Sequence, residues 1–137
     1  MTIPTKPMMA LRFIATVVLS AVVAQAGWAA AYLGGDRSYL RQHTLGGGVT
    51  LAVCVLAATA YVALRRAAGR VNVALAIFLA AAVGGQYALG AVEAVGPHIF
   101  LGVLIAMIAT ALTSWTYRHQ DSSVITSGDG LAPGSGR

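Results

Sequence analysis

Four long runs of apolar residues alternate with short polar stretches along this chain. The runs cover residues 13–33, 44–64, 71–92 and 99–117, and none of them contains a charged side chain. Each is close to the roughly 20 residues that a helix needs to cross the hydrocarbon core of a bilayer. Because the bilayer core offers no water to the backbone, such segments are expected to be helices. The pattern predicts an all-α integral membrane protein, a four-helix bundle with up-down-up-down topology.

The composition supports a membrane protein. Hydrophobic residues make up 58% of the chain and charged residues only 9%, whereas an ordinary soluble domain carries about 25% charged residues. The net charge of +5 does not indicate nucleic-acid binding, because the basic residues are not interleaved with aromatic side chains and the lipid bilayer is the expected partner. Cys54 is the only cysteine and falls inside the second run, so we expect a buried packing residue.

The basic residues indicate an orientation. Two of them, Arg37 and Arg41, lie at one end of the spans together with Asp36 and Glu93. Six lie at the other end: Lys6, Arg12, Arg65, Arg66, Arg70 and Arg118. By the positive-inside rule the second end is cytoplasmic. We therefore expect a bacterial cell-membrane protein with a cytoplasmic segment 1–12, a transmembrane bundle 13–117 and a disordered cytoplasmic tail 118–137 that is rich in Ser and Gly.

The N-terminal region has a second interpretation. Lys6 and Arg12, the apolar stretch after them and the small residues around Gln25 imitate a signal peptide with its cleavage site. Apolar residues continue past that site to Leu33, however, which favours a retained span.

Two histidines carry the candidate chemistry. His43 and His98 each stand at the beginning of an apolar run, the second and the fourth, on the same expected side of the membrane. Ionisable residues at such positions are energetically expensive and usually functional. Helices 2 and 4 of an up-down-up-down bundle lie on a diagonal, and their expected separation of about 12 to 14 Å suits two imidazoles that bind one metal ion. The pair therefore resembles the axial ligands of a haem.

Small residues accompany both histidines. Gly46 and Gly47 follow His43 by about one helical turn, and Gly102 follows His98 in the same way. Residues at this spacing share a helix face, so the glycines can clear space for a flat macrocycle. The alternative is that they only allow close helix packing, as small residues do in membranes.

Four further polar residues complete the candidate site. Arg37 and Arg41 precede His43 and can pair with haem propionates, or they are solvated loop charges. Gln25 and Gln86 fall near the ends of the first and third runs, where they flank the cofactor or form polar contacts between helices. The order Gln, small residues, loop, His and Gly occurs once in each half of the chain, which suggests an internal duplication of a helix pair.

These residues resemble a known family. Gln86, Gly90, His98 and Gly102 are similar to the second helix pair in one half of haem A synthase, and His43 with its glycines is similar to the first pair. That family consists of two four-helix halves, each with two histidines at the ends of its second and fourth helices. The chain resembles a single half over residues 13–117, and also small four-helix membrane proteins related to that half. The resemblance implies haem ligation by His43 and His98.

The chain also departs from the family. Leu40 stands where the catalytic half has a glutamate, and the cysteine pair found in many members is absent. The sequence therefore favours a b-type haem protein with two histidine ligands that transfers electrons, with a quinone or a redox protein as partner, or that serves as the haem-binding unit of a larger assembly. Two alternatives remain. One is a half-sized haem A synthase-like oxygenase that acts as a homo-oligomer, and the other is a structural or transporter-like bundle without a cofactor.

Overall fold

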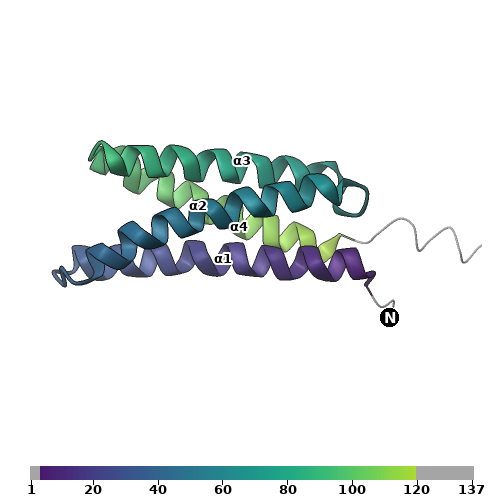
Figure 1. Cartoon of the computed structure of the whole chain (residues 1–137), viewed down its shortest axis with the longest axis horizontal. Helices are drawn as coiled ribbons and strands as arrows, with labels where there is room; N and C mark the ends of the chain where they lie inside the picture. Colours follow the sequence, from purple (N-terminus) through teal and green to yellow (C-terminus); the bar gives the residue numbers. More distant parts are fainter. Residues whose placement is uncertain (1–3, 120–137) are drawn as a thin grey trace, which may run out of the picture.

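The computed structural model describes residues 4–119 as four helices that run alternately up and down. The helices are α1 (Lys6–Leu33), α2 (Tyr39–Ala63), α3 (Arg65–Ala91) and α4 (Val95–Arg118). Each helix packs against the next, and α4 closes the ring against α1 (Figure 1). All four are long and apolar enough to cross a membrane. The structure therefore confirms the predicted all-α bundle.

The two ends of the bundle differ in what they carry. One end contains the α1–α2 and α3–α4 connections, and we call it the histidine end because His43 and His98 lie there. The other end contains the α2–α3 connection, the beginning of α1 and the end of α4, and we call it the terminal end (Figure 1). Across the ring, α1 and α3 approach each other more closely than α2 and α4, so both histidine-bearing helices lie on the wider diagonal.

The helices extend beyond the apolar runs that predict them. Helix α1 begins at Lys6, with Pro7 in its first turn, where the missing N–H of proline costs no hydrogen bond. Helix α2 begins at Tyr39, so His43 lies in its second turn. The expected loop between the second and third runs is short, and Gly69 interrupts the helical geometry of α3 there with φ of 77°. Most of the expected tail, residues 120–137, lies outside the described residues.

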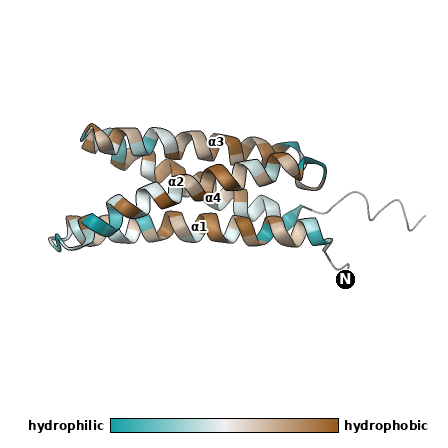
Figure 2. Ribbon diagram, viewed as in Figure 1, coloured by the Kyte–Doolittle hydropathy of each residue, from teal (hydrophilic) through white to brown (hydrophobic). Residues whose placement is uncertain are grey.

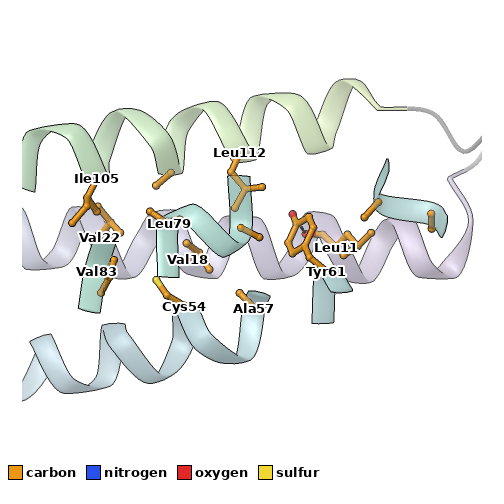
Figure 3. Packing of buried hydrophobic residues seen from close by; sticks show 14 of the residues in the cluster. Leu11, Val18, Val22, Cys54, Ala57, Tyr61, Leu79, Val83, Ile105 and Leu112 are labelled. Carbon is orange, nitrogen blue, oxygen red and sulfur yellow. Dashed lines mark hydrogen bonds between the residues drawn. The ribbon is translucent and has the colours of Figure 1, made fainter. Parts of the chain in front are cut away.

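Small and aliphatic side chains form the core along the bundle axis (Figure 3). In α1 the buried positions recur every three or four residues: Leu11, Ala15, Val18 and Val22. This spacing gives one buried face, which packs against both α2 and α4, so the first span is an integral part of the bundle. Cys54 belongs to the same core and is 2% exposed, as expected for a packing residue.

The outer surface is apolar as well. Phe13, Leu56 and Phe100 are 70%, 69% and 66% exposed, and hydrophilic residues are concentrated toward the two ends of the bundle (Figure 2). An apolar surface of this kind is unfavourable in water but suits lipid tails. The bilayer is therefore the expected surroundings of the helices.

A buried polar network joins all four helices near the terminal end. The hydroxyl of Tyr61 in α2 lies 2.7 Å from that of Thr116 in α4 and 3.3 Å from the carbonyl oxygen of Leu11 in α1. The Thr116 hydroxyl also lies 3.5 Å from Oδ1 of Asn72 in α3, and the Asn72 amide donates to the Ala68 carbonyl oxygen. Because each hydroxyl has one hydrogen to donate, two of the three hydroxyl contacts are hydrogen bonds at any one time. Every side chain of this network has a partner, so we interpret it as a structural tie between the four helices.

Candidate functional site: the histidine pair

The structure brings His43 and His98 together between α2 and α4. Their ring centroids are 6.0 Å apart, and the ring planes make an angle of 83°. Two metal–nitrogen bonds of about 2 Å would place two ligating nitrogens about 4 Å apart. Each ring centre lies roughly 1 Å behind its nitrogen, given ring bonds of about 1.3 Å. The expected centroid separation for two axial imidazoles is therefore about 6 Å. The observed separation agrees with this value and is also that of two rings in direct edge-to-face contact.

A hydrogen bond to α3 fixes the ring of His98. Its Nδ1 lies 3.0 Å from the backbone carbonyl oxygen of Gln86. A carbonyl oxygen can only accept, so Nδ1 carries the proton and the lone pair is on Nε2. Histidines that bind metals usually donate their other ring N–H in this way, because the bond sets the tautomer and orients the ring. Nε2 of His98 therefore carries a free lone pair, which is the form in which a histidine nitrogen binds a metal.

Gly90 allows this hydrogen bond to form. A Cβ atom at position 90 would lie 3.1 Å from Cε1 and 3.3 Å from Nδ1 of His98, which is tighter than ordinary van der Waals contact. The absence of a side chain therefore lets the imidazole approach the backbone of α3. The sequence pattern includes Gly90 in the internal repeat and in the family resemblance but does not predict its contact with His98. Its position four residues after Gln86, on the same helix face, is the signal that points to this contact.

His43 lacks a corresponding partner. Its Nδ1 is buried and has no hydrogen bond within residues 4–119. The amide nitrogen of Gln25 and the amide oxygen of Gln86 are also buried without a partner, and the fourth such atom in the described residues, Arg12 Nε, belongs to the first helix near the terminal end. Buried polar groups without hydrogen bonds are rare in proteins and call for an explanation such as a missing ligand or water. Three of these four atoms lie at the histidine end, which marks it as the candidate site.

The glycines next to the histidines are covered by side chains from α1 and α3. A Cβ atom on Gly46 would collide with the amide of Gln25 and the ring of Trp28. One on Gly102 would lie 3.1 Å from the amide nitrogen of Gln86. The two glutamines thus take equivalent places in the two helix pairs, as an internal duplication would produce. The same packing is what the helix-packing alternative requires of Gly46 and Gly102.

Two aromatic residues that the sequence analysis did not assign to the site also lie here. Trp28 covers Gly46, and a Cβ atom on Gly47 would lie 3.7 Å from the ring of Tyr87. Because the histidines come from α2 and α4, a flat group between their rings would extend toward α1 and α3. A macrocycle would therefore have to displace Gln25, Trp28, Gln86 and Tyr87.

The two arginines of the candidate site lie at the surface. Arg37, in the α1–α2 connection, and Arg41, in the first turn of α2, are both exposed, and within residues 4–119 neither side chain has a recorded hydrogen bond. The nearby carboxylate of Asp36 bonds to Ser38: it accepts hydrogen bonds from the hydroxyl and the backbone N–H of that residue at 2.6 and 3.0 Å. These two bonds lower the pKa of Asp36 below its usual value. Both guanidinium groups thus remain available to an external carboxylate.

The donor set limits the kind of metal group that fits. Within residues 4–119 no cluster of three or more His, Cys, Asp or Glu side chains is placed to hold a metal ion. Zinc sites usually take three or four protein ligands. A haem iron receives four nitrogens from its macrocycle and needs only axial side chains from the protein. Two histidines with no third ligand therefore fit a haem better than a bare ion.

Comparisons with models of protein families, with curated proteins and with solved structures find no match for this chain. The functional interpretation therefore depends on the residues of the histidine end.

Proposed function

We propose that this chain is a membrane-embedded protein that binds one b-type haem through His43 and His98. The observation that carries the proposal is the geometry of the pair: a centroid separation of 6.0 Å, with Nδ1 of His98 committed to the Gln86 carbonyl oxygen. The buried Nδ1 of His43, which has no hydrogen-bond partner within residues 4–119, supports the proposal, because this ring is not committed to another part of the bundle.

The residues around the pair would have distinct roles. His43 and His98 would be the axial ligands, while Arg37 and Arg41, both exposed next to α2, would pair with the propionates by forked hydrogen bonds. Gln25 and Gln86 would turn away from Gly46 and Gly102 and leave room for the macrocycle. When bound, the haem supplies a one-electron couple between ferrous and ferric iron. With both histidines bound to the iron, no position would remain open for oxygen, which would suit electron transfer more than oxygen chemistry.

The basic residues support a proposal for the membrane and the orientation in which this protein works. We propose that the protein lies in a bacterial cell membrane with both termini in the cytoplasm, which places the histidine end near the outer face. A quinone or a redox protein would then exchange electrons with the haem there, either with this chain alone or within a larger membrane complex.

Haem titration of the purified protein in detergent tests the proposal. The expected result is a six-coordinate low-spin absorption spectrum with a split α-band after reduction, together with a rise in thermal stability on addition of haem. A ligand that binds only the native state stabilises it by about 2.7 kcal/mol at a hundredfold excess over Kd. Absence of both the low-spin spectrum and the stabilisation would leave the bundle without a cofactor and refute the proposal.

A further inference from the structure

The terminal end carries positive charge that no acidic side chain of residues 4–119 balances. Within residues 4–119 the only acidic side chains are Asp36 and Glu93, and both lie in the connections of the histidine end. The remaining two acidic residues, Asp121 and Asp129, fall outside the described part of the chain. In contrast, Arg65, Arg66 and Arg70 stand within six positions at the start of α3 and are all exposed. No carboxylate of residues 4–119 lies at this end, so these guanidinium groups are open to an anion from outside.

Two shallow clefts, both open to the surroundings, flank these arginines. One, of about 390 Å³, lies between the beginning of α1 and the α2–α3 connection, where Pro7, Leu64, Arg65 and Arg66 line it. The other, of about 400 Å³, is lined by Arg65, Arg66 and Arg70 together with residues further along α3. Arg65 and Arg66 border both clefts, so their guanidinium groups can reach a ligand on either side.

The second cleft is polar at one end and apolar at the other. Beyond Arg70 it is lined by Val73, Ala74 and Ile77, which share one face of α3 with Arg70 because residues three and four apart are neighbours on a helix. Ala74 is exposed, and Ile77 is 49% exposed. From Arg70 to Ile77 the helix rises by about 10 Å. A ligand that fits this cleft has an anionic head followed by a hydrocarbon chain.

We propose that Arg65, Arg66 and Arg70 form a binding site for an anionic glycerophospholipid. The phosphate of the headgroup would be held by the arginine forks, which are well suited to phosphate oxygens. One acyl chain would run along Val73, Ala74 and Ile77 toward the centre of the membrane. Basic pockets at the cytoplasmic ends of transmembrane helices recognise such lipids, and the apolar wall distinguishes the site from one for free phosphate. This proposal is independent of haem binding.

Lipid selection by the whole protein provides the test. The protein is reconstituted into vesicles that contain phosphatidylglycerol and phosphatidylcholine and is extracted in mild detergent, and the lipids that remain bound are counted by native mass spectrometry. We expect phosphatidylglycerol to be enriched over phosphatidylcholine. Each arginine near a lipid surface contributes about fivefold in affinity, so the variant Arg65→Gln/Arg66→Gln/Arg70→Gln should lose at least about fivefold of the enrichment.

Two further variants distinguish a specific lipid-binding site from a general effect of the protein's net charge. Arg37→Gln/Arg41→Gln removes basic residues from the opposite end and should lower the enrichment less than the triple arginine variant does. Ala74→Phe keeps every arginine but fills the apolar part of the cleft, and it should reduce the enrichment. The helical circular dichroism spectrum of each variant shows that the bundle is folded. Because detergent extraction samples the lipids of both leaflets, a change of topology in the vesicle does not affect the count.

Three results would overturn the proposal. The first is equal enrichment in the wild type and the triple arginine variant. The second is an equal loss when Arg37 and Arg41 are replaced, which would reduce the effect to overall charge. The third combines two observations: inorganic phosphate added to the extracted protein removes all bound phosphatidylglycerol, and Ala74→Phe has no effect. Together they would make the site one for phosphate alone.

Discussion

His98 donates a hydrogen bond from Nδ1 to the carbonyl oxygen of Gln86, 3.0 Å away. The ring of His43 has its centroid 6.0 Å from that of His98, but its buried Nδ1 has no partner among residues 4–119. The two histidines therefore occupy equivalent places in the sequence pattern, but only the ring of His98 is oriented by a hydrogen bond to its other nitrogen. A ligand whose ring is already oriented loses less freedom when it binds a metal. We expect His98 to be the firmly held ligand and His43 the weaker one.

This inequality predicts different outcomes for the two alanine variants. His98→Ala should lose nearly all bound haem, while His43→Ala should retain a fraction as high-spin haem with a single protein ligand. The ratio of haem to protein after gel filtration and the absorption spectrum measure both effects. His119→Ala, at the terminal end, is the control and should behave as wild type. A normal low-spin spectrum in either ligand variant would refute that residue as a ligand, and equal haem loss in both would refute the inequality.

Gly90 should matter for haem affinity although it is not a ligand. An added Cβ would lie 3.1 Å from His98, so Gly90→Ala should push the ring away from the Gln86 carbonyl oxygen. Loss of such a supporting hydrogen bond typically lowers metal affinity by 10- to 100-fold. The matched control is Ala29→Gly, because Ala29 stands four residues after Gln25 as Gly90 stands after Gln86. Titration with haem should show weaker binding only for Gly90→Ala, and unchanged affinity would contradict the proposed support.

The four spans and much of the candidate site could be predicted from sequence. Length and hydropathy defined the helices, because the membrane requires long apolar segments with internally satisfied backbones. The proximity of His43 and His98 followed from their matching positions at the beginning of the second and fourth spans. Cys54 was correctly predicted as a buried residue from its place within a span.

Contacts that depend on side-chain direction could not be predicted. The covering of Gly46 by Gln25 and Trp28 depends on how α1 rotates about its axis relative to α2, and apolar periodicity does not define rotation when nearly all faces of a helix are apolar. The hydrogen bond of His98 goes to the backbone carbonyl of Gln86. Every residue has such a carbonyl, so the sequence points to this bond only through the spacing of Gly90 from Gln86. The beginning of α1 at Lys6 was likewise missed, because polar residues at a helix end do not continue an apolar run.

The glycines of α2 should respond very differently to alanine. Gly46→Ala places a methyl group against Gln25 and Trp28, and such overpacking typically costs about 1 to 3 kcal/mol. At Gly48 a Cβ would meet nothing within 4 Å, so Gly48→Ala should be neutral or stabilising by up to about 1 kcal/mol. Thermal unfolding in detergent without haem compares the two. Equal stability of both variants would contradict the close contact between α1 and α2 at Gly46.

The distribution of basic residues predicts cytoplasmic termini and an outer histidine end. Single cysteines at Ser38 and Ser122 in a Cys54→Ala background test this with a reagent that does not cross membranes. Ser38 lies in the α1–α2 connection, and Ser122 lies outside the described residues. Intact cells should be labelled at position 38, and position 122 should react only after lysis. The opposite pattern would reverse the topology and place the proposed lipid site in the outer leaflet.

The nearly perpendicular imidazole planes predict a specific magnetic signature for the haem protein. Each imidazole raises the energy of one iron dπ orbital through overlap with its own π system. If the rings kept their angle of 83° when haem binds, they would raise the two iron dπ orbitals about equally, and the ferric low-spin protein would give a highly anisotropic electron paramagnetic resonance spectrum. Parallel planes would split the orbitals and give a rhombic spectrum. His43→Ala supplied with free imidazole is the matched comparison, because a free ligand is not held at this angle and its spectrum should become more rhombic. A rhombic spectrum from the wild type would show that the rings rotate when haem binds, and the ring orientation described above would then belong only to the haem-free protein.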